Sequence, residues 1–284
     1  MEDQWNGSWF RREYLAQDLG WVGDDALWLE PQPWAILGGA AAEHQSALVH
    51  SIDKMVRRPS PIGAMLSSQS VPQFPSAPGN LTNAGVWPSI NGTLIKALAG
   101  VDTAMAWEEW LKNTLAVHAE AYPEKWVGTW SAADCYNSEL AEDPGGTEYI
   151  PDPQRRAVSM NWTDFPVLNL HPHAWPLYNV ADFIVKRFTP DGIVLQPRLP
   201  EPAYSFSSAL LSFEKSTKGY GGRYSPLGGG RMTVTLLLPE NEQRGTLYID
   251  GSERAAGTVP GGIRFETDRA QPWDWVFSGT SPDL

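Results

Sequence analysis

Cysteine is almost absent from this sequence, since Cys135 is the only one in 284 residues. An internal disulfide and a cysteine-based zinc cluster are therefore excluded, and a reducing compartment suits the chain. The sequence also lacks a basic, apolar leader at its start and any run of about 18 apolar residues. We therefore expect a cytoplasmic protein without a membrane partner.

Positive charge is scarce as well. Lys and Arg number 21 against 33 Asp and Glu, which gives a net charge of −12. This charge repels the phosphate backbone at long range, so nucleic acid is not an expected partner. Hydrophobic residues make up 42% of the chain, with 26 Gly and 24 Pro, which predicts a loop-rich globular protein with a sizeable core.

Tryptophan, by contrast, is abundant, and twelve of the 14 fall within the first 175 residues. An indole ring offers a wide apolar face and one hydrogen-bond donor, which suits core packing and equally suits the C–H face of a sugar. We expect most of these side chains to pack in a core and the remainder to line a site.

Hydrophobic periodicity divides the chain near residue 190. Before that point, apolar residues recur at helical spacing, and we expect helices over residues 31–41, 42–57, 87–100, 101–122 and 176–188. The helices at 31–41, 87–100 and 176–188 are apolar nearly all round, which is typical of buried helices. Two concentric helical layers, and so an all-α barrel or bundle, follow from this alternation.

After residue 191 the pattern changes to short alternating segments. Residues 233–238, 246–249 and 263–266 predict antiparallel strands, while the Gly-rich residues 219–231 predict turn and loop. The sequence therefore predicts a mainly α fold followed by a small antiparallel β module.

Candidate site residues gather in four segments, three of which come directly before an expected buried helix. Pro31, Pro88 and Pro176 are expected in the first helical turns, so the three loops should open at one end of the inner layer. Polar groups among indole rings are typical of a carbohydrate site. The expected substrate-binding residues are Trp28, Glu30, Gln32, Trp34, Asn83, Trp87, Ser89, Trp130, Asn137, His171 and His173.

These residues also have structural interpretations, which the sequence leaves open. Glu30 and Gln32 are equally suited to satisfying the N–H groups at a helix start. Asn83 and Ser89 suit a turn and a cap, and Asn137 with Asp134 suits a loop held by local hydrogen bonds. His171 and His173 stand two residues apart without an identifiable third ligand, so we expect no metal site.

Four motifs resemble those of glycoside hydrolase family 94, the cellobiose-phosphorylase-like enzymes related to the glycosyltransferase-36 catalytic region. They are Trp5-Asn-Gly-Ser-Trp-Phe-Arg-Arg-Glu-Tyr14, Leu27-Trp-Leu-Glu-Pro-Gln-Pro-Trp34, Asn83-Ala-Gly-Val-Trp87 and Asp191-Gly-Ile-Val-Leu-Gln-Pro-Arg-Leu-Pro200. The resemblance implies the second half of an (α/α)6 barrel, of the six-hairpin glycosidase type, over residues 1–190. It also implies a β-rich module over residues 191–284 and a homodimer.

The resemblance further implies an inverting enzyme that cleaves or transfers β-linked glucosyl units of an oligosaccharide or β-glucan. The family's general acid lies in an Asp-Trp-Asn-Asp motif that is absent here, so the catalytic Asp is expected upstream of this chain. Ser89 and the Leu170-His171 pair replace the family's phosphate contacts, and Thr82 replaces an acidic residue. Inorganic phosphate as co-substrate therefore remains open against hydrolysis, for which Asp134 or Asp164 would act as base; no other cofactor is expected.

Two alternatives to a carbohydrate-active enzyme remain. One is a non-catalytic carbohydrate-binding or structural protein that retains the aromatic cleft without the general acid. The other is an unrelated helical scaffold in which every Trp belongs to the core. Linkage, sugar identity and oligomeric state are not readable from the sequence.

Overall fold

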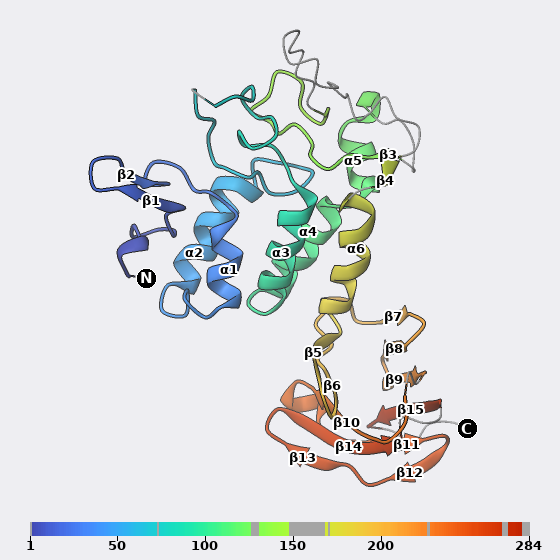
Figure 1. Ribbon diagram of the computed structural model, residues 1–284. Coiled ribbons are helices and arrows are strands. Elements are labelled where there is room, and N and C mark those ends of the chain that lie inside the picture. Colours follow the sequence, from blue (N-terminus) through green and yellow to red (C-terminus); the bar gives the residue numbers. More distant parts are fainter. Residues whose placement is uncertain are drawn as a thin grey trace. The chain divides into compact units, whose positions relative to one another are not determined.

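The computed structural model describes residues 2–72, 74–125, 131–147, 168–169, 171–225, 228–268 and 272–279 (Figure 1). The chain divides into two compact units, Met1–Asn179 and Val180–Leu284, which we call the helical unit and the β unit. Each is described by itself. None of the helices in the described part of the chain is both long and apolar enough to cross a membrane.

The helical unit begins with short strands and continues as helices joined by long loops (Figure 1). Its strands are β1 (Glu13–Ala16), β2 (Gly20–Val22), β3 (Ser131–Ala132) and β4 (Leu168–Asn169). Its α-helices are α1 (Pro31–Leu37), α2 (Gln45–Ile52), α3 (Pro88–Ala99), α4 (Thr103–Lys112), α5 (Leu115–Ala121) and α6 (His171–Asp182), the last of which reaches into the β unit. Shorter turns of helix are η1 (Glu2–Gln4), the π-helical η2 (Asp53–Arg57) and η3 (Pro123–Lys125).

Local sequence signals account for several helix ends. Pro31 and Pro88 lie in the first turns of α1 and α3, where their missing N–H groups cost nothing. Asp102 caps α4, because its Oδ1 accepts a hydrogen bond from the Met105 N–H at 3.0 Å. The helix predicted over 101–122 is interrupted where Thr114 caps α5 by accepting from the Val117 N–H.

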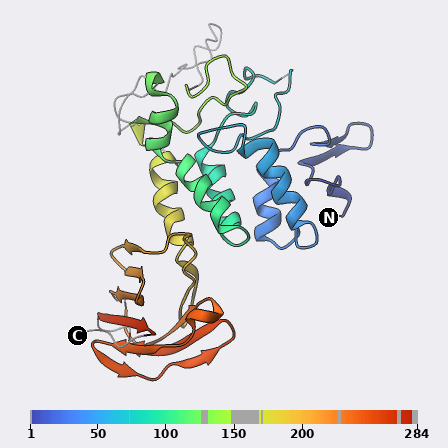
Figure 2. The same ribbon diagram turned by 180° about the vertical axis from the view of Figure 1, so that it is seen from behind.

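Helices α1, α3 and α6 run in one direction and α2 and α4 in the other, so the first three begin at the same end of the helical unit (Figures 1 and 2). Helix α3 packs against both α1 and α4. It also meets α6, since the side-chain amide of Asn179 donates to the Gly92 carbonyl at 2.9 Å.

The β unit consists of two sheets whose buried side chains form one hydrophobic cluster, which includes Val234 and Phe265 from one sheet and Phe213 and Trp275 from the other. The five-stranded sheet has the order β13-β14-β10-β6-β5, and the six-stranded sheet β12-β11-β15-β9-β8-β7. Only β10 and β6 pair in parallel among these neighbours. The elements are β5 (Val185–Thr189), β6 (Gly192–Leu195), β7 (Tyr204–Ser207), β8 (Leu211–Ser216), β9 (Gly219–Tyr224), β10 (Arg231–Leu237), η5 (Glu240–Glu242), β11 (Thr246–Ile249), β12 (Ser252–Arg254), β13 (Gly257–Val259), β14 (Gly262–Asp268) and β15 (Trp273–Ser278).

The prediction of a mainly α fold containing half of an (α/α)6 barrel is wrong. Helix makes up 28% and strand 29% of the structure, which is a mixed α/β fold. Residues 185–189, expected to continue a helix that starts at Pro176, form β5, and Pro176 lies inside α6. An apolar run without polar gaps fits the end of a helix followed by a strand as well as it fits one long helix.

The Gly-rich residues 219–224 form strand β9 and not the predicted loop. A Cβ on Gly222 would lie 2.2 Å from the carbonyl oxygen of Ser212 on β8, so only glycine permits this close pairing. The glycines that suggested a turn instead allow neighbouring strands to approach.

Candidate functional site: the loop end of the helical unit

Backbone hydrogen bonds join the loops that precede α1 and α3. The loop before α1 pairs with residues 65–68, these pair with the loop before α3, and that loop pairs with residues 135–137. The bonds run from the Leu29 N–H to the Leu66 carbonyl, from the Leu66 N–H to the Gly85 carbonyl and from the Val86 N–H to the Tyr136 carbonyl, each at 2.8 Å. Strand β3 lies a few residues before 135–137 in the sequence, and it pairs in parallel with β4, which precedes α6.

We call these paired segments, residues 27–30, 65–68, 85–87, 131–137 and 168–169, the loop ribbon. It links the segments before α1, α3 and α6, which begin at the same end of the helical unit (Figures 1 and 2). The loops at Glu30, Trp87 and His171 thus lie at one end of the helical unit, although the third helix begins at His171 and not at the expected Pro176.

Gln32 belongs to the frame that holds the loop ribbon. Its side chain is fully buried, and its Nε2 donates to the carbonyls of Phe10 at 2.8 Å and of Trp28 at 2.6 Å. Its Oε1 accepts from the Phe10 N–H at 3.0 Å. Because all of these polar atoms are used within the protein, Gln32 has a structural role at this position.

Asn83 and Asn137 hold long loops in the same way. The buried amide of Asn83 accepts from the Val71 N–H at 2.7 Å and donates to the Ser76 carbonyl at 2.9 Å. Asn137 is buried and donates to the Asp143 carbonyl at 3.0 Å. Of the interpretations that the sequence left open, these bonds support the turn and loop roles.

Glu30 and Trp34 differ from these frame residues because both are exposed. Glu30 occupies the position before α1, yet its side chain makes no capping hydrogen bond, and no ion pair of Glu30 occurs among the described residues. Trp34 is 61% exposed. Four residues apart at the start of a helix, the two side chains share one face.

The other predicted indole rings are more enclosed. Trp28 is 3% exposed and packs under the guanidinium of Arg12, whose central carbon lies 4.4 Å from the ring centroid. Trp87 is half-buried and donates from Nε1 to the Leu81 carbonyl at 2.9 Å. Trp28 is therefore a packing residue, while Trp87 retains a partly exposed ring beside the half-buried Ser89.

Asp134 is half-buried on the loop ribbon. The second predicted base, Asp164, and the predicted ring of Trp130 lie outside the described residues. His171 and His173 fall in the first turn of α6, and their side chains also lie outside the described part. Among the described residues, no cluster of three or more His, Cys, Asp or Glu side chains could hold a metal ion.

His118, on α5, packs beside the loop ribbon. It is buried, its Nε2 donates to the Gly145 carbonyl at 2.8 Å, and its ring centroid lies 4.3 Å from that of Tyr136. Burial lowers the pKa of His118, more than the Gly145 carbonyl and the Glu124 charge raise it.

Comparison with protein-family models gives no match, and comparison with curated proteins gives none either. Among solved structures, a GH127 β-L-arabinofuranosidase from Geobacillus stearothermophilus T6 is 12% identical, with a TM-score of 0.31, over 87% of this chain and 40% of that one. A second GH127 β-arabinofuranosidase is 11% identical, with a TM-score of 0.31, over 88% of this chain and 42% of that one. A third structure, named as a glycoside hydrolase, is 11% identical, with a TM-score of 0.29, over 87% of this chain and 45% of that one. This chain spans less than half the length of each.

The resemblance to glycoside hydrolase family 94 is therefore wrong. No family model matches, and the neighbours that carry a family name belong to GH127. The printed names of these neighbours are those of glycoside hydrolases, and none of them describes a β-glucoside phosphorylase. At these TM-scores the likeness assigns this chain neither a fold nor an activity. The motifs that carried the resemblance contain Gln32 and Asn83, whose hydrogen bonds here hold loops together.

Proposed function

We propose that the loop end of the helical unit binds a saccharide, and that the chain is the sugar-binding part of a carbohydrate-active enzyme. The observation that carries this proposal is the pair formed by Glu30 and Trp34. Both are exposed on one face, and neither serves the frame of the loop ribbon.

The two side chains offer the complementary contacts that a sugar ring needs. An exposed indole face packs against the apolar C–H face of a pyranose or furanose. A carboxylate one turn away accepts hydrogen bonds from the hydroxyls at the ring edge, and such charge-assisted bonds are stronger than neutral ones. The partly exposed ring of Trp87 is the second stacking surface in this proposal.

Hydrolysis by inversion needs two carboxyl groups on opposite sides of the scissile bond. Glu30 is exposed and Asp134 is half-buried, on loops that the ribbon connects. We propose Asp134 as the base that activates water and Glu30 as a substrate contact, while the acid that protonates the leaving oxygen is a carboxyl group outside the described residues.

Sugar binding without catalysis is the second candidate. It is favoured by the frame roles of Gln32, Asn83 and Asn137, which leave few predicted polar groups to face a reacting sugar. The two candidates differ in whether reducing sugar is released.

Calorimetric titration with cellohexaose, xylohexaose and a linear arabino-oligosaccharide tests the binding proposal. We expect at least one of these to bind, and Trp34→Ala to weaken that binding at least tenfold because the stacking face is lost. Phe188→Ala is the matched control, since Phe188 is an exposed ring on β5, at 66%, and plays no part in the proposed site. Equal affinities of the wild type and Trp34→Ala, or no binding of any of the three, would refute the proposal.

Reducing-sugar release from the oligosaccharide that binds then separates the two candidates. If the chain is catalytic, Asp134→Asn lowers the rate at least a hundredfold and leaves the affinity within threefold of the wild type. Binding with no release supports the non-catalytic candidate.

A further inference from the structure

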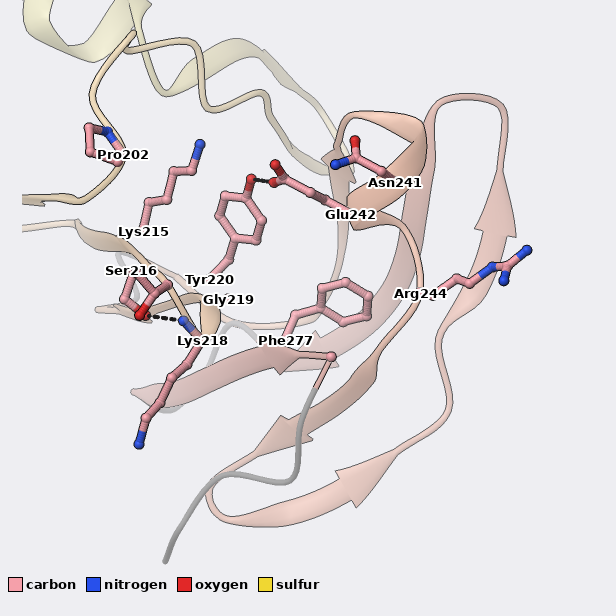
Figure 3. Close-up of a pocket in the computed structure, with 12 residues that line it drawn as sticks. Pro202, Lys215, Ser216, Lys218, Gly219, Tyr220, Asn241, Glu242, Arg244 and Phe277 are labelled. Carbon is pink, nitrogen blue, oxygen red and sulfur yellow. Dashed lines mark hydrogen bonds between the residues drawn. The ribbon is translucent and has the colours of Figure 1, made fainter.

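A cavity of about 450 Å³ lies within the β unit (Figure 3). Its walls come from the hairpin of β8 and β9, from η5 and the segment after it, and from the end of β15. The residues that matter for its chemistry are Pro202, Lys215, Tyr220, Asn241, Glu242 and Arg244. None of them belongs to the loop ribbon.

Lys215 occupies an unusual place for a lysine. On β8 it shares the inward-facing row with Leu211 and Phe213, and it pairs directly with the buried Tyr220 on β9. Its ammonium lies 5.8 Å from the Tyr220 ring centroid and forms no ion pair among the described residues. Partial burial removes some of the water around this charge, and a bound anion would compensate for that loss by pairing with it.

Glu242 supplies a fixed acceptor on another side of the cavity. The Tyr220 hydroxyl donates to Glu242 Oε2, and Figure 3 shows this contact beside the side chain of Asn241. Within the described part of the chain, Glu242 Oε1 accepts no hydrogen bond. Burial, together with the Glu242 carboxylate, raises the pKa of Tyr220, so the tyrosine stays protonated as the donor that fixes the carboxylate.

The charge around the cavity is opposite in sign to that of the chain. Three cationic residues, Lys215, Lys218 and Arg244, line the cavity together with one carboxylate, Glu242, whereas the whole chain carries −12. In Figure 3, Lys218 and Arg244 extend away from Tyr220 on opposite sides, so they flank the cavity. Such an arrangement attracts an anion to a generally acidic protein.

A simple inorganic anion would leave the rest of the cavity without matching groups. The Oε1 of Glu242 can accept a hydrogen bond from a hydroxyl, the Asn241 amide both donates and accepts, and the exposed ring of Pro202 adds an apolar surface. A ligand that combines a carboxylate, several hydroxyls and an apolar face satisfies all of these groups.

We infer that this cavity binds an acidic saccharide. The carboxylate of a uronic acid residue contacts Lys215, and the sugar hydroxyls contact Glu242 and Asn241. The inference goes beyond the proposed function, because it concerns other residues in the other unit.

Titration calorimetry of the full chain with trigalacturonate, with cellotriose as the neutral match, tests this inference. We expect trigalacturonate to bind at least tenfold more tightly than cellotriose, and its affinity to fall as salt is raised. Lys215→Met should weaken the binding of trigalacturonate at least tenfold, because it removes the cation and keeps the apolar stem. Glu242→Gln should weaken the same binding several-fold. Lys186→Met is the control for the loss of charge, because Lys186 is exposed on β5 and does not line the cavity.

Three results would overturn the inference. The first is equal affinity for trigalacturonate and cellotriose, and the second is citrate binding as tightly as trigalacturonate, which would indicate an anion site without sugar recognition. The third is trigalacturonate affinity that Lys215→Met leaves unchanged. Trp34→Ala separates the two sites: it should leave trigalacturonate affinity intact, whatever becomes of the saccharide proposed for the helical unit.

Discussion

Arg57 and Glu109 form a buried ion pair in the helical unit, with Arg57 Nε donating to Glu109 Oε2 at 2.7 Å. The same guanidinium donates to Asp53 Oδ1 at 2.6 Å, and Glu109 Oε1 accepts from the Ala64 N–H at 2.6 Å. The pair therefore connects α4 to η2 and to the segment that leads into the loop ribbon. Its charges are enclosed and fully hydrogen-bonded, so each depends on the other.

Replacing Arg57 by Met should destabilise the chain by about 3–5 kcal/mol, because the buried Glu109 would lose its cation and Asp53 would keep only the exposed Arg58. The free energy of unfolding in urea measures this loss. Glu108→Gln is the matched control: Glu108 also approaches Arg57, at 3.6 Å, but is 70% exposed. Its replacement should change the free energy by less than about 1 kcal/mol. Equal effects of the two variants would contradict the role assigned to the buried pair.

His118 should make stability depend on pH in a predictable direction. Burial lowers its pKa below the ordinary 6.5 in the folded chain, so the unfolded chain binds the proton more readily. The contribution of His118 is fully present above about pH 6.5 and is lost as the pH falls through the lowered folded pKa. Unfolding in urea at pH 8 and at pH 5 should show this loss.

His118→Gln isolates that contribution from other acid-sensitive groups. A glutamine Nε2 can still donate to the Gly145 carbonyl but does not titrate in this range. We expect the variant to lose less stability than the wild type between pH 8 and pH 5. An identical loss in both proteins would show that His118 is not the titrating group.

Gln32 and Glu30 test the division between frame and site. In Gln32→Glu, a carboxylate would replace the amide that donates to the carbonyls of Phe10 and Trp28, and both bonds would be lost in a buried position. We expect a loss of more than about 2 kcal/mol in the free energy of unfolding. Glu30→Gln, on the exposed face, should stay within about 0.5 kcal/mol. Similar stability of the two variants would contradict the frame role of Gln32.

This division shows how far the sequence could predict the site. The Pro residues marked the starts of α1 and α3, and the common end of the helices followed from their directions. Which of Glu30 and Gln32 faces Phe10 depends on a contact 22 residues away in the chain, which local spacing does not encode. Glu30 and Gln32 were therefore indistinguishable before the structure.

For the fold, too, the sequence predicted some elements but not their tertiary pairing. The helix expected from residue 101 begins as α4, and alternating residues marked β10, β11 and β14. The extent of the β unit was not predictable, because β9 is Gly-rich and its pairing depends on the close approach of β8 and β15. Intrinsic strand propensity is low in such a segment, and tertiary contacts decide its conformation.

The contact between α3 and α6 gives the last prediction. A Cβ on Gly92 would lie 2.3 Å from Cε3 of Trp175, so no space remains for a methyl group. At an open helical position, Gly→Ala raises stability by about 1 kcal/mol, because alanine loses less backbone entropy. Here the overlap should reverse the sign, and Gly92→Ala should destabilise the chain by about 1–3 kcal/mol.

The double variant Gly92→Ala with Trp175→Leu decides whether this overlap is the cause. Leucine is smaller than the indole, so the added methyl group would find room, and the second substitution should cost less in the Gly92→Ala background than in the wild type. Urea unfolding of the four proteins gives this coupling energy. Strict additivity of the two substitutions would mean that α3 and α6 do not approach each other at Gly92 as described, and the hydrogen bond from Asn179 to the Gly92 carbonyl would then need another explanation.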